Sequence, residues 1–432
     1  MQLIAADIIV APTDQAYRVE ESIVQGLRDT TVRIVANEEN LSTGASQTAL
    51  TTLFGLIAMM GISIDLVIPA VPLVGEQPPL RGDELRAGLI DYGHDLIPGA
   101  GIRSAADARD PDITFAIGSS PARGERLLRI VGDEWRATVA RDGNVAPYPI
   151  RGAWPIGALA AAGAAAPEAL RAALPHIAYR SGHALPREER FQLDLQRSIH
   201  VDLSAPGLTT EAPSIGPVDI ISGGAITTAA IFSLLRVPGI TGALRVLEPK
   251  HIKVENLNRY GLARRSDCGR RKIDLLADFS HSNLPISGLA ERLTPTWTDT
   301  NGRLARRVLV GVDDIPTRWT AQRAADGWLC VAGTSHFFGM VTTHNAHGPC
   351  AGCAHPRDEV LDAEIPTISF VSFWTGLLQA RALLVDAATG GGRVSGLYVS
   401  PFGLYGPHGL HMVGVAPRRD CPVRCPASRL VA

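Results

Sequence analysis

The stretch that decides the fold is VENLNRYGLARRSDCGRRK, residues 254–272. It follows an apolar run, residues 243–247, which has the length and composition of a buried strand and is followed by the acid Glu248. The chain then carries two asparagines, an arginine and the sequence Asp-x-Gly-x-x-Lys. Open α/β sheets bind ligands at the carboxyl ends of their strands, so this stretch predicts a binding site there.

The residues before it have the order of a βαβ unit. The expected elements are a strand at 218–221, a turn at 222–227, a helix up to 235 and a strand at 244–247. Pro238 and Gly239 end the helix, because neither residue continues one favourably. The unit is typical of a Rossmann-like phosphate-binding fold.

The turn keeps only part of the glycine pattern of that fold. Read as G-x-G-x-x-G, it retains Gly224, whereas Ser222 and Thr227 replace the outer glycines. In a Rossmann-like unit the amides at the helix N-terminus, here of Gly223, Gly224 and Ala225, face an anion. Taken alone, the turn is also compatible with simple packing.

The polar groups after the second strand favour a nucleotide site. Glu248 stands roughly 20 residues after the turn, where an acid binds ribose hydroxyls. The spacing of Asn256, Arg259 and Lys272 lets an amide, a guanidinium and an ammonium converge on phosphates at the sheet edge. An NAD-dependent oxidoreductase would leave these groups without a role.

A further acid follows a later strand. The apolar run 308–312 precedes Asp313, and a carboxylate at this edge of a parallel sheet can hold Mg²⁺. Structural interpretations exist for single residues: Asp313 as a helix N-cap, Arg259 as a surface ion pair and Lys272 as a solvated side chain. The ordered set favours a common site over these separate roles.

Four of the six cysteines form two close pairs, Cys350-x-x-Cys353 and Cys421-x-x-x-Cys425. In a cytoplasmic protein, paired cysteines favour tetrahedral zinc over a disulfide. We therefore expect a structural Zn²⁺ site, with a vestigial site as the alternative. A zinc ion held by four thiolates has no open position for chemistry.

Residues 218–390 resemble the adenylating domain of the ThiF family, which includes ubiquitin-activating enzymes and the activators of sulfur-carrier proteins. The resemblance is carried by GGAIT, LRVLE, VENLNRY, DCGRRK, VDDIPTR and the paired cysteines. The chain departs from the family at the outer glycines and in having a glutamate where most members have an aspartate.

The resemblance implies ATP as the nucleotide and assigns a role to each matching residue. By this resemblance, Glu248 contacts the ribose, while Asn256, Arg259 and Lys272 contact the triphosphate. Asp313 is implied in binding Mg²⁺ and the α-phosphate. Catalysis would consist mainly of positioning and of cationic stabilisation by Arg259, Lys272 and the metal ion.

The first half of the chain repeats the pattern without the chemistry. The repeated elements are strands at 31–36, 64–68 and 113–117 and a helix at 46–60. Pro69 stands where Glu248 would stand, and Gly118-Ser-Ser follows the third strand without an aspartate. We therefore predict an inactive adenylation-like domain at residues 1–190 and an active ATP-binding domain with the zinc site at residues 191–432.

The expected fold class is α/β, with tandem Rossmann-like ThiF-type adenylation domains that form an intramolecular pseudo-dimer with a four-cysteine zinc site. In relatives, an arginine near the start of one half reaches the ATP site of the other. Arg18 is the candidate here, and a solvated helix arginine is the alternative.

The resemblance implies ATP-dependent adenylation of the C-terminal carboxylate of a ubiquitin-like or sulfur-carrier protein with a Gly-ended tail. A conjugating enzyme is then the expected partner. The alternatives are an adenylating enzyme of a peptide-maturation pathway and an inactive scaffold. Residues 355–370, where relatives carry the thioester cysteine, contain none. Cys268 has arginine neighbours that favour its thiolate, but its place in the motif points toward ATP.

Bulk composition is compatible with this prediction. A chain of 432 residues with 46% hydrophobic residues can bury a large core and form two domains. The net charge of −2 predicts no broad basic surface, so we expect no nucleic-acid partner. The uncharged stretch 49–64 is short for a membrane span, and no signal peptide is recognised at the start, so we expect a cytoplasmic protein without membrane association.

Overall fold

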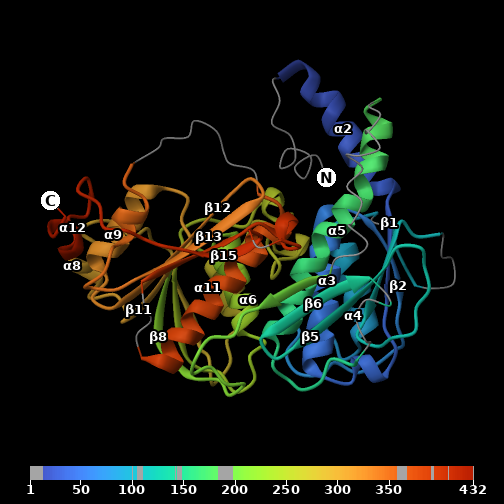
Figure 1. The fold of residues 1–432 in the computed structure, drawn as a ribbon, viewed down its shortest axis with the longest axis horizontal. Coiled ribbons are helices and arrows are strands. Elements are labelled where there is room, and N and C mark those ends of the chain that lie inside the picture. Colours follow the sequence, from blue (N-terminus) through green and yellow to red (C-terminus); the bar gives the residue numbers. More distant parts are fainter. Residues whose placement is uncertain are drawn as a thin grey trace.

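The computed structural model describes residues 13–99, 101–104, 110–141, 143, 148–182, 198–357, 367–390, 394–406 and 408–431, with side chains from residue 20 onward. The described residues form two mixed sheets with helices packed against them (Figure 1). The predicted α/β class with two Rossmann-like sheets is confirmed.

The first sheet has seven strands in the order β3-β2-β1-β4-β5-β6-β7. Its first five strands are parallel and the last two are antiparallel. The strands are β1 (Thr31–Val35), β2 (Ser63–Val67), β3 (Ile102–Ser104), β4 (Ile113–Ile117), β5 (Leu127–Asp133), β6 (Arg136–Arg141) and β7 (Ile199–Asp202). The helices of this half are α2 (Thr13–Asp29), α3 (Gly44–Met60), α4 (Leu85–Leu96) and α5 (Ile156–Arg180), with a 3₁₀ turn η1 at Glu39–Leu41.

The second sheet has eight strands in the order β10-β9-β8-β11-β12-β13-β14-β15. The strands are β8 (Ser214–Ile221), β9 (Thr241–Leu247), β10 (Ile286–Leu289), β11 (Arg307–Val310), β12 (Trp328–Ser335), β13 (Phe338–His344), β14 (Ser395–Val399) and β15 (Leu410–Val413). The helices are α6 (Ala225–Leu234), α7 (Lys272–Ala277), α8 (Trp297–Asn301), α9 (Ile315–Ala324), α10 (Ala351–Ala354), α11 (Ser369–Thr389) and α12 (Pro426–Arg429). Three 3₁₀ turns are η3 (Val254–Asn256), η4 (Arg265–Asp267) and η5 (Pro401–Gly403).

The parallel strands of the two sheets have the same spatial order. In each half the third, second, first, fourth and fifth strands lie side by side, and antiparallel strands follow. This common order is the observation that supports an internal duplication. It brings the loops after β8, β9 and β11 to one edge of the second sheet, because the carboxyl ends of parallel strands point the same way.

The two halves share one apolar core. Helix α3 is buried along nearly its whole length, and α5 packs against α11 of the second half. Two glycines make this close packing possible: a Cβ at Gly163 would lie 2.9 Å from the Phe373 ring, and one at Gly376 would lie 2.3 Å from the carbonyl oxygen of Ile226. The halves are therefore packed as one body.

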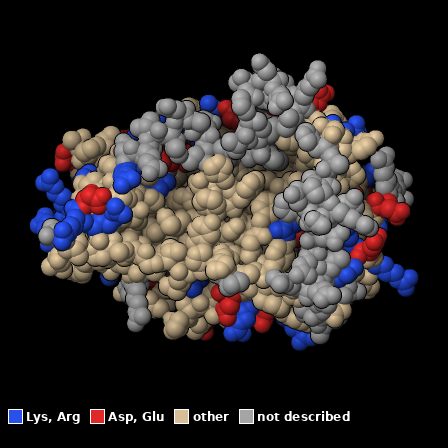
Figure 2. All heavy atoms as spheres, turned by 45° about the horizontal axis from the view of Figure 1, so that its top comes forward, with Lys and Arg blue, Asp and Glu red and all other residues tan. Residues whose placement is uncertain are grey.

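The predicted domain boundary near residue 190 lies outside the described residues. Strand β7, which follows that boundary in sequence, pairs with β6 and so belongs to the first sheet. Among the described residues, no helix has both the length and the apolarity that crossing a bilayer requires. On the face in Figure 2, charged side chains gather toward the rim around a broad uncharged centre.

Candidate nucleotide and metal sites

The turn between β8 and α6 keeps its tight geometry although it has lost its first glycine. Ser222 has φ 87°, a left-handed conformation that favours glycine and costs other residues about 1–2 kcal/mol. Its Oγ accepts a hydrogen bond from Gly224 N at 3.0 Å, and Thr227 Oγ1 donates to the carbonyl oxygen of Ser222 at 2.6 Å. These hydrogen bonds help to hold Ser222 in this conformation, so the turn does not need the missing glycine.

Glu248 lies directly beneath this turn. Its side chain is buried at the end of β9, where Oε2 accepts from Gly223 N at 3.0 Å and Oε1 accepts from Lys250 N at 2.8 Å. A Cβ on Gly223 would lie 3.1 Å from Glu248 Cγ and 3.5 Å from Lys272 Cβ. The turn, the acid and the lysine therefore contact one another. Oε2 also faces the Ser222 hydroxyl at 3.5 Å and Lys272 Nζ at 3.6 Å, whereas Oε1 can accept a further hydrogen bond, as a ribose hydroxyl would require.

Lys272 is buried, which rules out its alternative interpretation as a solvated side chain. Its Nζ lies 3.6 Å from Glu248 Oε2 and 5.2 Å from the centre of the Tyr260 ring. Burial lowers the pKa of Lys272 and Arg259 adds to this effect, whereas the carboxylates of Glu248 and Asp313 oppose it. Lys272 is thus within electrostatic reach of the other charged residues of the predicted site.

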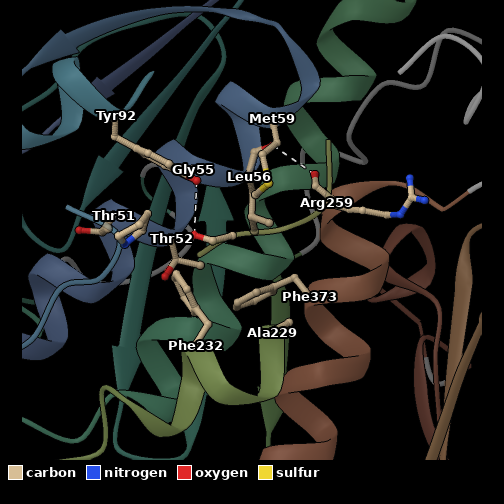
Figure 3. Close-up of a pocket in the computed structure, with 13 residues that line it drawn as sticks. Thr51, Thr52, Gly55, Leu56, Met59, Tyr92, Ala229, Phe232, Arg259 and Phe373 are labelled. Carbon is tan, nitrogen blue, oxygen red and sulfur yellow. Dashed lines mark hydrogen bonds between the residues drawn. The ribbon is translucent and has the colours of Figure 1, made fainter. Parts of the chain in front are cut away.

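Arg259 lies at the seam between the two halves. Its main chain borders a small pocket of about 20 Å³ that is lined largely by apolar side chains, among them Leu56 of α3, Phe232 of α6 and Phe373 of α11. The guanidinium turns away from that pocket (Figure 3). Its Nη1 donates to Asn258 Oδ1 at 2.9 Å.

The two asparagines of the opening stretch have different surroundings. Asn256 Oδ1 accepts from Lys253 N at 3.0 Å and so closes the turn η3, and its contact with phosphate remains a prediction. Asn258 is buried beside Arg259 and orients that guanidinium, a role that sequence reasoning missed. The available signal was the second asparagine directly before the arginine.

Asp313 is exposed in the loop after β11. The N-cap of the following helix is Asp314, which accepts from Thr317 N at 2.9 Å, so Asp313 is not the capping residue. The buried Arg318 donates from Nε and Nη2 to the carbonyl oxygen of Val312 at 3.1 and 2.9 Å. This arginine fixes the backbone directly before Asp313.

The structure therefore brings the 222–224 turn, Glu248 and Lys272 into contact, with Arg259 and Asp313 in electrostatic reach. Ala225 is the first residue of α6, behind the N-cap Gly224, and the contact of these amides with an anion remains a prediction. Arg18 falls within α2, but its side chain lies outside the described residues.

The corresponding edge of the first sheet carries polar side chains that hydrogen-bond to one another and to the backbone. Asn40 is fully buried, accepts from Ser119 N at 2.9 Å and donates to Asn37 Oδ1 at 2.6 Å. Arg129 donates to the carbonyl oxygens of Gly118 and Ser120 at 3.2 and 2.9 Å. Gly118 has φ 59°, and a Cβ there would lie only 2.1 Å from Asn40 Oδ1.

The four paired cysteines form one buried cluster, as predicted. Their sulfur atoms all lie within 4.8 Å of one another, and Sγ–Sγ distances are 3.4 Å for Cys350–Cys421 and 3.6 Å for Cys353–Cys425. Tetrahedral zinc with Zn–S bonds of about 2.3 Å places its sulfurs about 3.8 Å apart. The donor set therefore fits a zinc ion held by four thiolates.

The cluster ties the C-terminal segment to the second sheet. A Cβ on Gly352 would lie 2.7 Å from Val423 Cγ2, so the two segments approach closely, and Arg323 of α9 donates to the carbonyl oxygen of Pro422 at 2.7 Å.

His344 is buried nearby with its ring nitrogens 2.9 Å from the Thr342 hydroxyl and from the carbonyl oxygen of Pro349, and burial lowers its pKa to about 4.

The remaining two cysteines have environments unsuited to a nucleophile. The expectation that the thiolate of Cys268 is favoured is wrong: burial raises the pKa of Cys268, and Asp267 and Asp95 add to a rise that Arg265 only partly offsets. Cys330 is fully buried in β12, as expected of a core thiol, and burial raises its pKa.

Comparisons with known proteins show a partial likeness of fold. No family model matches the chain, and no curated protein matches it. Among solved structures, the chain is similar to E. coli MccB with MccA-N7isoASN, at 14% identity over 50% of this chain and 67% of that chain, with a TM-score of 0.39. E. coli MccB with ATP has 15% identity over 59% and 73% of the two chains, with a TM-score of 0.38. PaaA has 12% identity over 46% and 73%, with a TM-score of 0.36.

Proposed function

We propose that this protein is an ATP-dependent adenylating enzyme that activates the C-terminal carboxylate of a ubiquitin-like or sulfur-carrier protein. The observation that carries the proposal is the buried Lys272, which lies against Glu248 beneath the Gly223–Gly224 turn, within electrostatic reach of Arg259 and Asp313. A buried ammonium with a carboxylate beside it, at the ligand-binding edge of a Rossmann-like sheet, suits a nucleotide polyphosphate.

The residues would divide the work as follows. The amides of Gly223, Gly224 and Ala225 would donate to phosphate oxygens, and Glu248 would accept from the ribose hydroxyls. Arg259 presents a forked guanidinium and Lys272 a compact ammonium to the phosphates, while the Asn256 amide is proposed to contact them as well.

The reaction needs no nucleophile from the protein. A carboxylate oxygen of the acceptor would attack the α-phosphorus, a new P–O bond would form, and the bond to the β-phosphate oxygen would break to release pyrophosphate. Arg259 and Lys272 would stabilise the charge that accumulates on the phosphoryl oxygens. Asp313 would hold Mg²⁺, which supplies further neutralisation of phosphate charge when bound.

The first half is proposed to be an inactive partner in an intramolecular pseudo-dimer. Support comes from its sheet edge, where Asn40 and Arg129 are engaged in hydrogen bonds with their neighbours. Arg18 is proposed to reach from this half toward the nucleotide of the other.

The zinc site is proposed to be structural. Its four thiols leave no open position on a tetrahedral ion, and all four side chains are buried. Zn²⁺ would hold the C-terminal segment on the second sheet, and no reaction step is assigned to it.

A protein acceptor is supported by apolar side chains exposed on the antiparallel strands of the second sheet. Phe338 and Met412 are exposed there, and Tyr398 stacks on Phe338 with ring centres 5.5 Å apart. Two of the six cysteines lie outside the four-cysteine cluster. Cys330 is buried and Cys268 is half-buried, so neither has an exposed side chain. We therefore propose that the adenylate passes directly to a conjugating or sulfur-donating partner without a thioester on this chain.

Isotope exchange between pyrophosphate and ATP tests the activity. Wild type is incubated with ATP, Mg²⁺, labelled pyrophosphate and a candidate acceptor with a Gly-ended tail, in parallel with Asp313→Ala. Label should enter ATP with wild type and fall steeply with the variant. Exchange that requires a short peptide in place of a ubiquitin-like protein would favour the peptide-maturation alternative. The absence of exchange with either acceptor would favour the scaffold.

A further inference from the structure

The loop that carries the predicted phosphate-binding residues is held from the other half of the chain. Its tip, residues 261–267, contacts α4 and the Pro78–Pro79 segment of the first half through side-chain hydrogen bonds. Tyr92 of α4 is fully buried and its hydroxyl lies 3.4 Å from the carbonyl oxygen of Gly261. Tyr92 and Arg259 border the same pocket, shown in Figure 3.

Arg264 makes three side-chain hydrogen bonds to the first half, into which its buried side chain inserts. Its Nη1 lies 2.7 Å from Asp91 Oδ2, and its Nε and Nη2 donate to the carbonyl oxygen of Pro79 at 3.3 and 3.1 Å. The Asp91 side chain is 62% exposed, whereas that of Arg264 is 3% exposed. Asp91 is therefore the charged partner of a buried guanidinium.

A second acid of α4 closes the turn η4. Asp95 Oδ2 accepts from Arg265 N at 2.7 Å and from Ser266 N at 3.4 Å. These are the first amides of that turn, which lack partners within it. Within the turn, Asp267 Oδ2 accepts from Arg264 N at 2.9 Å. The Asp95 carboxylate of the first half extends this local cap to the next two amides.

The tip lies between Arg259 and Lys272 in the sequence and is close to both. Arg259 stands two residues before Gly261, and Lys272 stands five residues after Asp267. At its base the loop is closed by backbone hydrogen bonds, from Ile252 N to Arg270 O at 2.8 Å and from Lys272 N to Lys250 O at 3.1 Å. A shift of the tip would therefore move Arg259, which is two residues away. It would also strain the backbone hydrogen bonds at the base of the loop, where Lys272 lies.

We propose that Asp91 and Asp95 are positioning residues, through which the first half holds Arg259 and Lys272 in the geometry that binds ATP. This inference rests on the proposed function. The first half thereby gains a role that its own sheet edge does not supply: it is a fixed support for the nucleotide loop of the second half.

The test compares Asp95→Ala, Asp95→Asn and Asp91→Asn with Asp83→Asn, which removes an exposed acid from the same half. The KM for ATP and kcat are measured in the pyrophosphate exchange reaction, and amide hydrogen exchange is followed in peptides that cover 261–272. Asp95→Ala should raise the KM for ATP about tenfold, as expected for the loss of a charged hydrogen bond, and should speed exchange in these peptides. Asp95→Asn keeps an acceptor oxygen and should recover part of both effects.

The outcomes separate the two claims. A wild type without exchange activity would remove the proposed function, and this inference with it. An active wild type whose KM for ATP stays within about twofold in Asp95→Ala and Asp91→Asn, a change below the value of one hydrogen bond, would overturn the inference alone. If Asp95→Ala fails to fold, Asp91→Asn decides the result, because its partly exposed side chain can be changed without creating a cavity.

Discussion

A buried cluster between the halves makes their packing sensitive to pH. Glu168 of α5 accepts hydrogen bonds from the Tyr405 hydroxyl and from Arg171 Nη1, the latter at 2.5 Å, and Arg171 Nη2 donates to the carbonyl oxygen of Phe402 at 2.7 Å. Burial raises the pKa of Glu168 to about 7 in spite of the opposing charge of Arg171. Burial therefore raises the pKa of Glu168 by more than the ion pair with Arg171 lowers it.

The sign of the pH effect follows from the raised pKa. The folded state holds the Glu168 proton more tightly than the unfolded chain does, so its contribution to stability is complete below about pH 4.5 and is lost as the pH rises through 7. Between pH 5 and pH 8 the loss amounts to about 2–3 kcal/mol. Glu168→Gln carries no titrating group and should not show this loss.

The assay is urea unfolding of wild type and Glu168→Gln at several pH values between 5 and 8. The free energy of unfolding of the variant relative to wild type should improve by about 2–3 kcal/mol from pH 5 to pH 8. The exposed Glu211→Gln serves as a control and should show no such trend. A difference between Glu168→Gln and wild type that stays constant with pH would refute the reasoning.

Three further predictions concern the two sites. Metal analysis of the purified protein should find one zinc ion per chain. Cys353→Ser should lower both the zinc content and the melting temperature. A wild-type protein that keeps its full thermal stability without bound metal would contradict a structural zinc site. Lys272→Met should reduce pyrophosphate exchange at least about 100-fold, as expected for the loss of a preorganised cation, with little change in far-UV circular dichroism. Ser222→Gly should raise the free energy of unfolding by up to about 1 kcal/mol, because glycine adopts the left-handed conformation at φ 87° without strain. Chemical denaturation measures this change. A loss of stability would mean that the hydrogen bond of the Ser222 hydroxyl contributes more than the strain costs.

The strands and helices around the nucleotide site could be predicted from apolar runs and breakers. The predicted strand 218–221 is the last part of β8, and Glu248 follows β9 as expected. The four-cysteine cluster was also predictable, because thiol spacing combined with metal chemistry leaves few alternatives. These features depend on local sequence or on the chemistry of one residue type.

The remainder depends on contacts between distant residues. Nothing in the sequence shows that a serine would adopt φ 87° at the turn, because that conformation is held by hydrogen bonds to Gly224 and Thr227. The burial of Lys272 depends on Tyr260 and Glu248, and the capping of η4 by Asp95 joins residues 170 positions apart. Periodicity cannot predict such pairings, because they follow from how the two halves pack.

The central claim is that the turn, Glu248, Lys272, Arg259 and Asp313 enclose a single magnesium nucleotide. Calorimetric titration of ATP with Mg²⁺ into wild type, Lys272→Met and Asp313→Ala tests it most directly. One binding site per chain in wild type, with affinity about tenfold or more weaker in each variant, is the predicted result. Wild type that releases no heat of binding, or variants that bind as tightly as wild type, would contradict the claim.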